Sequence, residues 1–336
     1  MALSLLVAAT PFSEAHAQKT DLVVLPNGDR ITGTVKFLER GRLSYSTDHL
    51  QRISIDWTQI TRISSIHLFD FELSNSNHLF GSIDEGPEDG QMVIVSDSIR
   101  VTVRIRDVVR IEPLYSVFWD RFTGSSIEAG VDFTKANLQR LWNLSTQLKY
   151  RTRKWLLTFD GSSYLNVQEG RESTNRNSAS LTPQRFLAGG FTVYGIVKAE
   201  QNDELNLELR GTAILGASRF FISTNRYSLE GRLGLALTEE QFKGSMRTTN
   251  GEGVVSVDFS IFKFIIPKVD FRFSSFAYPS ISNWGRVRGN VTSSIQWEPI
   301  SDFRIGLNGF VVFDSRPAEG SATSDYGIFS SVGIVI

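Results

Sequence analysis

The chain has 336 residues, of which 41% are hydrophobic and 21% charged. This composition is too apolar for a disordered chain and too polar for a helical membrane protein. The formal net charge of −1 argues against a nucleic-acid-binding protein, which normally carries a basic excess, and the absence of cysteine excludes disulfides, thiolate zinc sites, iron–sulfur clusters and cysteine nucleophiles.

The first segment, residues 1–17, has the outline of a secretory signal peptide. An apolar run from Ala2 to Ala9 is followed by Pro11, and Ala15-His16-Ala17 forms a small-residue cleavage signature. A positively charged start is missing, so a small buried apolar segment is the alternative. No other stretch approaches the ~18 apolar residues of a membrane helix. The sequence therefore predicts an exported protein without a helical anchor.

Residues 21–114 contain an internal repeat with an offset of about 48 residues. Leu25 corresponds to Leu73 and Gly33 corresponds to Gly81, and the ends of the two units match as well. Apolar residues alternate with polar ones in both units, which is typical of half-buried strands. We expect two small β-barrel-like repeats, at residues 21–66 and 67–114.

The histidines of this region suggest no metal site. His49, His67 and His78 are spread over both units without metal-ligand spacing. They are interpreted as surface or turn residues, and no cofactor or metal is predicted.

A linker is expected at residues 115–126, because Glu112-Pro113 ends the second unit. It carries the aromatic residues Tyr115, Phe118, Trp119 and Phe122. Such a cluster before a membrane strand suits the bilayer interface. A packing patch between two domains is the alternative interpretation.

Residues 127–336 repeat a strand of about ten residues with strict alternation of apolar and polar side chains. Twelve strands are expected, at about 127–134, 142–150, 155–160, 177–182, 191–199, 207–215, 227–237, 255–261, 269–274, 286–297, 303–314 and 326–336. Soluble antiparallel sandwiches also alternate in this way, so alternation alone does not indicate a membrane.

Two further features favour a membrane barrel. The expected strands approach the ~9–11 residues that a tilted membrane strand needs, whereas soluble strands average ~5–6. Short turns at 151–154, 223–226, 265–268 and 299–302 contrast with longer polar loops at 168–176, 239–252 and 315–324. Outer-membrane barrels combine short periplasmic turns with longer external loops. The predicted fold is all-β: a twelve-stranded antiparallel transmembrane β-barrel preceded by the two β repeats. An even strand number leaves both barrel ends, and thus the repeats, in the periplasm.

The barrel face opposite the lipid is expected to be polar and balanced in charge. The charged residues predicted to line it as a possible pore are Lys149, Arg151, Asp160, Glu208, Arg210, Glu230, Arg232, Asp258, Asp270, Arg272, Arg286, Arg288 and Arg304. Unpaired buried charge is costly, so these groups must pair or meet water. Either a rigid interior closed by ion pairs or a polar passage for small solutes fits this pattern. A wall that carries charges of both signs predicts weak ion selectivity, since selective pores use rings of charges of one sign.

An enzymatic function is not expected. No histidine lies beyond residue 78, which excludes the serine–histidine chemistry of lipid-hydrolysing barrels. The chain has no P-loop, no dinucleotide-binding glycine pattern and no HExxH motif.

The layout resembles the "domain of unknown function 481" (DUF481) family, also called salt-induced outer-membrane protein or YdiY-like proteins. Four segments carry the likeness: Gly124–Val131, Lys154–Ser162, Thr224–Gly231 and Trp297–Ile305. The segments Asn27–Val35 and Ile55–Trp57 look like the periplasmic repeats that precede this domain in some members. The first loop, Thr134–Asn137, departs from the acidic loop usual in the family. The resemblance implies an outer-membrane β-barrel of unestablished activity and supplies no catalytic residues.

Three functions are therefore open. The first is a cell outer-membrane barrel that acts as a small-solute channel or envelope-stress protein. The second is a non-conducting structural or interaction protein whose periplasmic repeats, residues 21–114, bind a periplasmic or envelope partner. The third is a soluble periplasmic β-protein. Outer-membrane lipid is the expected surrounding and nucleic acid is not an expected partner, whereas the oligomeric state stays open.

Overall fold

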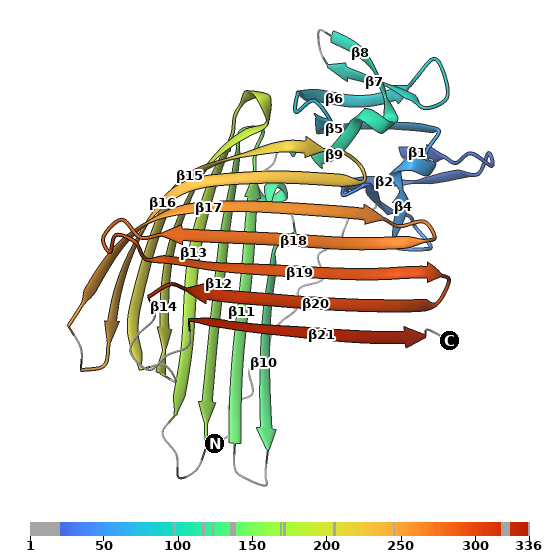
Figure 1. The fold of residues 1–336 in the computed structure, drawn as a ribbon. Coiled ribbons are helices and arrows are strands. Elements are labelled where there is room, and N and C mark those ends of the chain that lie inside the picture. The colour runs from blue at the N-terminus through green and yellow to red at the C-terminus, as the bar shows by residue number, and fades with distance from the viewer. Residues whose placement is uncertain are drawn as a thin grey trace.

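A computed structural model describes residues 21–96, 99–115, 118–122, 124–134, 139–168, 170, 173–203, 206–244, 246–316 and 323–334. The predicted signal peptide and most of the first loop lie outside these residues. The described chain is all-β and forms two antiparallel sheets, one of nine strands and one of twelve (Figure 1). No helix among the described residues is long and apolar enough to cross a membrane.

Residues 21–113, the N-terminal module, form the nine-stranded sheet. Its elements are β1 (Asp21–Val24), β2 (Arg30–Glu39), β3 (Arg42–Ser46), β4 (Arg52–Asp56), η1 (Trp57–Gln59), β5 (Arg62–Leu73), β6 (His78–Glu85), β7 (Gln91–Ser96), β8 (Ile99–Arg104), η2 (Ile105–Asp107) and β9 (Val108–Pro113). Eight strands pair in the order β4-β3-β2-β1-β5-β6-β7-β8, and β9 pairs with β2 and β5.

The structure places the two sequence repeats in one module. An offset of 48 residues relates the 3-10 turn η1 to η2. Gly33 and Gly81 are related by the same offset, and at both a Cβ atom would collide with the neighbouring strand, with Tyr45 and Ser46 or with Val95. The expected boundary at residues 66 and 67 falls inside β5, which pairs with β1 through its first half and with β9 through its second half. One strand therefore serves both units.

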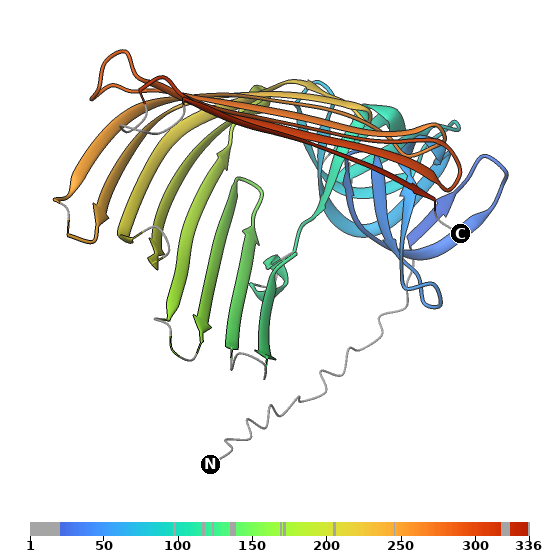
Figure 2. The same ribbon diagram turned by 60° about the horizontal axis from the view of Figure 1, so that its bottom comes forward.

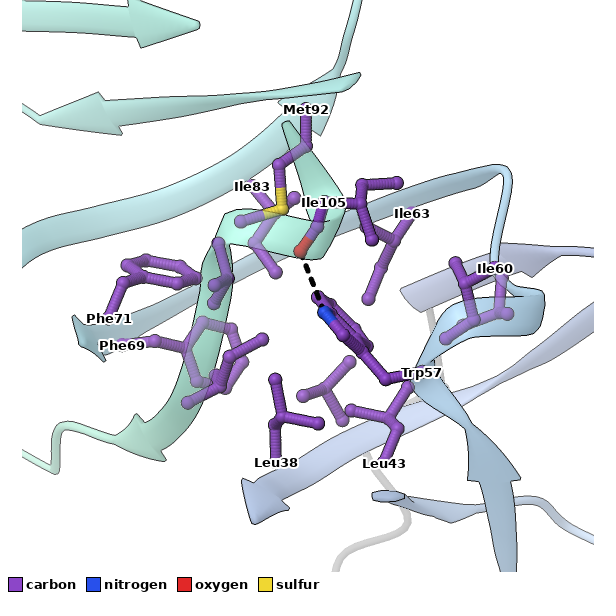
Figure 3. Packing of buried hydrophobic residues seen from close by; sticks show 14 of the residues in the cluster. Leu38, Leu43, Trp57, Ile60, Ile63, Phe69, Phe71, Ile83, Met92 and Ile105 are labelled. Atoms are coloured by element: carbon purple, nitrogen blue, oxygen red, sulfur yellow. Dashed lines mark hydrogen bonds between the residues drawn. The ribbon is translucent and has the colours of Figure 1, made fainter. Parts of the chain in front are cut away.

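A single hydrophobic core joins the two units. It combines Leu38, Leu43 and Trp57 of the first unit with Met92 and Ile105 of the second, all buried (Figure 3). The Nε1–H group of Trp57 donates a hydrogen bond of 2.7 Å to the carbonyl oxygen of Ile105, its counterpart 48 residues later. The core is thus centred on a contact between equivalent positions of the two repeats.

The twelve-stranded sheet confirms the predicted strand number and the antiparallel arrangement. Its strands pair in simple chain order: β10 (Ser126–Thr134), β11 (Gln139–Arg151), β12 (Trp155–Val167), β13 (Thr174–Phe186), β14 (Phe191–Asn202), β15 (Leu207–Ser223), β16 (Tyr227–Phe242), β17 (Thr248–Lys263), β18 (Lys268–Pro279), β19 (Val287–Ile300), β20 (Phe303–Asp314) and β21 (Ser324–Ile334).

Several strands are longer than expected from the sequence. β15 has 17 residues, and β16 and β17 have 16 each. The polar stretch assigned to a loop at 239–252 therefore belongs largely to β16 and β17. Charged and small residues there, such as Glu239 and Thr249, pair across the two strands, which period-two apolar patterning cannot reveal.

The sheet is strongly coiled, so the strand direction turns steadily from β10 to β21 (Figures 1 and 2). The twist of each strand accumulates across twelve strands. The described pairs include no ladder between β10 and β21, so the sheet curls around its inner face while both edge strands keep an unpaired side.

The two faces of this sheet differ sharply in chemistry. On β16 the outward side chains of Leu233, Leu235 and Leu237 are 64%, 63% and 56% exposed. Arg232 and Glu230 alternate with them and point to the opposite, inner face, where they pair with each other. A row of exposed leucines on a folded sheet requires an apolar surrounding or a partner.

Candidate functional site: the inner face and its mouth

The inner face carries an ion-pair network at its centre. Arg232 lies 2.6 Å from Glu230 and 3.5 Å from Asp258, and Glu230 and Asp258 are directly opposite on β16 and β17. The hydroxyl of Ser274 donates a 2.6 Å hydrogen bond to Asp258. Period-two alternation brings together residues that are far apart in the chain, as the sequence predicted for these charges.

A second set of pairs lies towards the longer loops. Arg210 bonds Glu240 at 2.7 Å. Nε of Arg288 bonds Glu252 at 2.9 Å and Nε of Arg286 bonds Asp314 at 3.0 Å. Each predicted cation here therefore has a carboxylate partner: on the next strand for Arg210, across β18 for Arg288 and at the end of β20 for Arg286. This end of the inner face is closely balanced in charge.

The remaining predicted residues also lie on the inner side, with one exception. Lys149 is opposite Thr158, Asp160 accepts a 2.7 Å hydrogen bond from Gln147, and Arg304 lies 3.2 Å from Glu298. Glu208 is the exception and lies on the outer side. It is the extra residue where the β15–β16 register shifts, and such a β-bulge interrupts the alternation of faces. Its side chain accepts a hydrogen bond from Gln241, which continues the outward series of Leu237.

The N-terminal module lies against the short-turn end of the twelve-stranded sheet (Figure 2). Three of the short turns touch it. The guanidinium of Arg153 stacks on Phe80 at 4.9 Å, that of Arg42 stacks on Phe264 at 4.3 Å, and the side-chain amide of Asn225 donates hydrogen bonds to two carbonyl oxygens of the module. The module therefore covers the mouth that the short turns surround.

Arg40 of the module makes a further contact with the twelve-stranded sheet. It makes two hydrogen bonds to Asp270, of 2.7 and 3.3 Å, and lies over the ring of Phe262. Arg272 approaches the same carboxylate at 3.1 Å. Asp270, predicted to line a passage, thus serves also as the docking point of the module.

Arg151 has a similar role on the opposite side of the mouth. This side chain is only 7% exposed and lies 3.3 Å from the buried carboxylate of Asp70, while Phe186 covers its guanidinium. Asp70 also binds Nδ1 of His78 at 2.8 Å. Arg151 is therefore a docking residue of the module. His78, interpreted from the sequence as a surface or turn residue, belongs to a half-buried charge cluster.

The contact with Asp70 makes the module's stability depend on pH. The hydrogen bond to Asp70 raises the pKa of His78 above its ordinary value of 6.5, against the opposing effect of burial. This stabilisation is fully present below pH 6.5 and is lost as the pH rises through the higher folded-state pKa. We expect His78→Gln to remove this pH-dependent stabilisation. The urea midpoint of the variant should then change less between pH 6 and pH 9 than that of the wild type. The exposed His49→Gln serves as the matched control, and an equal pH response in His78→Gln would contradict the assignment.

The pair Arg40–Asp270 offers a direct test of docking. A double-mutant cycle of Arg40→Ala and Asp270→Ala should give a coupling free energy of about 0.5–3 kcal/mol, as for other residues in contact. Urea unfolding of the full chain measures it. Additive effects of the two substitutions would show that the side chains do not interact.

A cavity of about 610 Å³ lies on the inner face of β15 to β21, and Arg40 of the module contributes to its wall. A smaller cavity of about 220 Å³ lies between Arg110 of the module and residues of β12 to β16. Module side chains therefore contribute to the walls of cavities on the inner face. The described residues include no group of His, Asp or Glu side chains placed to hold a metal ion.

Sequence reasoning missed Arg40 and Arg110 as parts of this site. One signal for Arg40 was available, because Arg40-Gly41 separates two alternating segments of the sequence. Glycine suits a tight hairpin turn, and in the structure the φ angles of both residues are positive, 51° and 68°. A hairpin tip formed by Arg-Gly places a cation at the end of two strands. Its partner 230 residues away could not be inferred from this pattern.

Comparison with known proteins identifies the family of the twelve-stranded sheet. The family model for "Protein of unknown function, DUF481" matches residues 127–329, from the second residue of β10 into β21. The chain belongs to the DUF481 family. No curated protein matches it. The family match covers the twelve-stranded sheet, so the N-terminal module is additional to the DUF481 region.

Proposed function

We propose that this DUF481 protein is a barrel of the cell outer membrane whose polar interior passes small solutes, with the N-terminal module on the periplasmic side. The observation that carries this proposal is the contrast between the two faces of one sheet. An exposed leucine row on β16 lies opposite an ion-paired, hydroxyl-rich wall. Membrane barrels have this arrangement, an apolar band outside and a polar lumen within. The proposed role is not catalytic.

Outward aromatic residues support the orientation. Trp155, Phe191, Tyr227 and Trp297 are exposed near the short-turn end, and Phe133, Phe313 and Tyr326 are exposed near the other end. The linker adds Trp119, which is 75% exposed. Its neighbour Phe122 packs on Tyr150 of β11. Aromatic girdles at both interfaces are typical of outer-membrane barrels. The N-terminal module, at the short-turn end, would then lie in the periplasm.

A bilayer adds one requirement to the described sheet. Unpaired backbone groups in hydrocarbon cost several kcal/mol each, and β10 and β21 each have an unpaired side. We therefore expect the two edges to pair in the membrane and to close the sheet.

A non-conducting role is the second candidate, and the docked module favours it. Arg40 and Arg110 reach the inner face from the mouth, and a covered mouth suits a structural or interaction protein. Envelope partners would then meet the exposed side of the module, where Ile66 and Ile99 are 74% and 61% exposed.

Conductance distinguishes these candidates. The full chain would be refolded, folding would be checked by heat-modifiable gel mobility, and the protein would be added to a planar bilayer. Discrete steps with weak ion selectivity are expected from a wall with paired charges. A folded barrel that gives no steps would contradict the proposed passage and favour the structural role.

A further inference from the structure

The large cavity on the inner face is built from two adjacent rows of side chains that cross the strands. The ladder pairs align the first row across β15 to β20. Its members are Phe220, Glu230, Asp258, Ser274, Thr292 and Phe310. We call it the first rung.

The second rung is the next row of inward side chains towards the short turns. It runs across β16 to β21 in the same manner. Its members are Ser228, Ser260, Arg272, Ser294, Asn308 and Phe329. Neighbouring strands lie about 4.7–4.9 Å apart, so both rungs present polar groups at regular, closely spaced intervals around the wall.

Five of the twelve side chains in the two rungs carry a hydroxyl group: Ser228, Ser260, Ser274, Thr292 and Ser294. A hydroxyl both donates and accepts hydrogen bonds, so a row of them matches another molecule rich in hydroxyls. Ser228 and Ser260 bond each other at 2.7 Å, whereas the side chains of Thr292 and Ser294 make no hydrogen bond within the part of the chain that the structure describes. Oδ2 of Asp258, by contrast, is buried and lies 3.5 Å from Nη1 of Arg232. The hydroxyls of Thr292 and Ser294 are thus available in the cavity as donors and acceptors.

The charges of the rungs are compensated by residues outside them. Arg232 neutralises Glu230 at 2.6 Å, and Asp270 neutralises Arg272 at 3.1 Å. A ligand with a strong net charge would have to compete with these pairs. The cavity therefore favours a neutral ligand.

Aromatic rings stand at the ends of the rungs. Phe310 and Phe329 are stacked with ring centroids 6.2 Å apart, and Phe329 is 61% exposed. Flat apolar rings beside a hydroxyl row can cover the C–H faces of a cyclic solute while its hydroxyls meet the wall. Pockets of about 300–1,000 Å³ that combine apolar walls with a few placed polar groups are the usual form of small-molecule sites.

We propose that the two rungs bind a short neutral carbohydrate on its way through the barrel. The inference rests on the proposed passage, because the rungs belong to the wall of that passage. The hydroxyls of Thr292 and Ser294 hydrogen-bond the sugar hydroxyls, and Phe329 covers one ring face.

The test uses maltotriose as the probe and the refolded full chain. Calorimetric titration in detergent measures binding, and current noise in a planar bilayer measures residence in the pore. Thr292→Val removes one hydroxyl at constant shape and should weaken maltotriose binding about two- to tenfold, the effect of one lost hydrogen bond. Thr212→Val is the matched control, because Thr212 lies on the inner face of β15 outside the rungs and its replacement should leave binding unchanged.

The outcomes separate this inference from the proposed passage. Maltotriose binding that Thr292→Val weakens and Thr212→Val does not supports the rungs as the site, even in a barrel that gives no conductance steps. A barrel that conducts but does not bind maltotriose overturns the inference and leaves the passage standing. Equal affinities in both variants, or a preference for the zwitterion trialanine over maltotriose, also overturn it.

Discussion

Replacing Trp57 by alanine should destabilise the N-terminal module by about 3–5 kcal/mol, the usual loss for a buried tryptophan. The side chain is fully buried among residues of both repeat units, and its indole N–H bonds the carbonyl of Ile105. The substitution removes the central packing contact and leaves the carbonyl of Ile105 without this donor. Because the core is shared, both units should lose stability together.

Urea unfolding of the full chain, followed by far-UV circular dichroism, measures this effect without relying on tryptophan emission. Trp284→Ala is the matched control. Trp284 is 84% exposed in the loop before β19, and its loss should change the stability by no more than about 0.5 kcal/mol. Separate unfolding of the two repeat units in Trp57→Ala, with one unit unaffected, would contradict a shared core.

Placing a charge on the outer face should have the second largest effect. Leu233→Arg is expected to lower the stability of the barrel in a bilayer by about 2–4 kcal/mol, the cost of arginine near the bilayer midplane. Leu233 lies in the middle of β16 with 64% of its surface exposed, and a cation there would face hydrocarbon. In water the same substitution should change the free energy of unfolding little, because the charge would stay hydrated.

The matched control introduces the same residue on the other face. Ser162→Arg places arginine at an exposed position of β12 on the inner side, where Ser162 contacts Ser178. Water in the interior should solvate this charge, so the substitution should change the free energy of unfolding by no more than about 0.5 kcal/mol. Denaturant titration of the refolded protein in lipid vesicles compares the two variants. A larger loss for Ser162→Arg would reverse the assignment of the faces.

Much of the fold is encoded locally, which explains what the sequence could predict. Period-two alternation, as in Leu233, Leu235 and Leu237, marks each long strand and its two faces. The short turns around Asn225 and Pro267 separate consecutive strands, so the chain-order topology of the twelve-stranded sheet follows from their length. The offset between Gly33 and Gly81 likewise predicted a repeated unit.

Other features depend on contacts between distant segments and leave no local pattern. Nothing in the sequence near Arg40 indicates Asp270, and Arg151 has the same alternation as residues that face the interior of the sheet. Its burial against Asp70 comes from docking of the module. The repeat predicted two units but not the strand that they share, because the apolar pattern of β5 continues across the expected boundary. The two rungs could not be predicted, because they depend on the register of six strand pairs.

In the proposed barrel, one face of the long sheet meets lipid and the other meets water. A single-cysteine scan of residues 142–147 on β11 tests this division between the faces, because the chain has no cysteine of its own. Each variant would be refolded into lipid vesicles and treated with a water-soluble maleimide. We expect labelling at 143, 145 and 147, whose side chains point inward, and protection at 142, 144 and 146. Equal labelling at all six positions, or protection of the inward set, would contradict it.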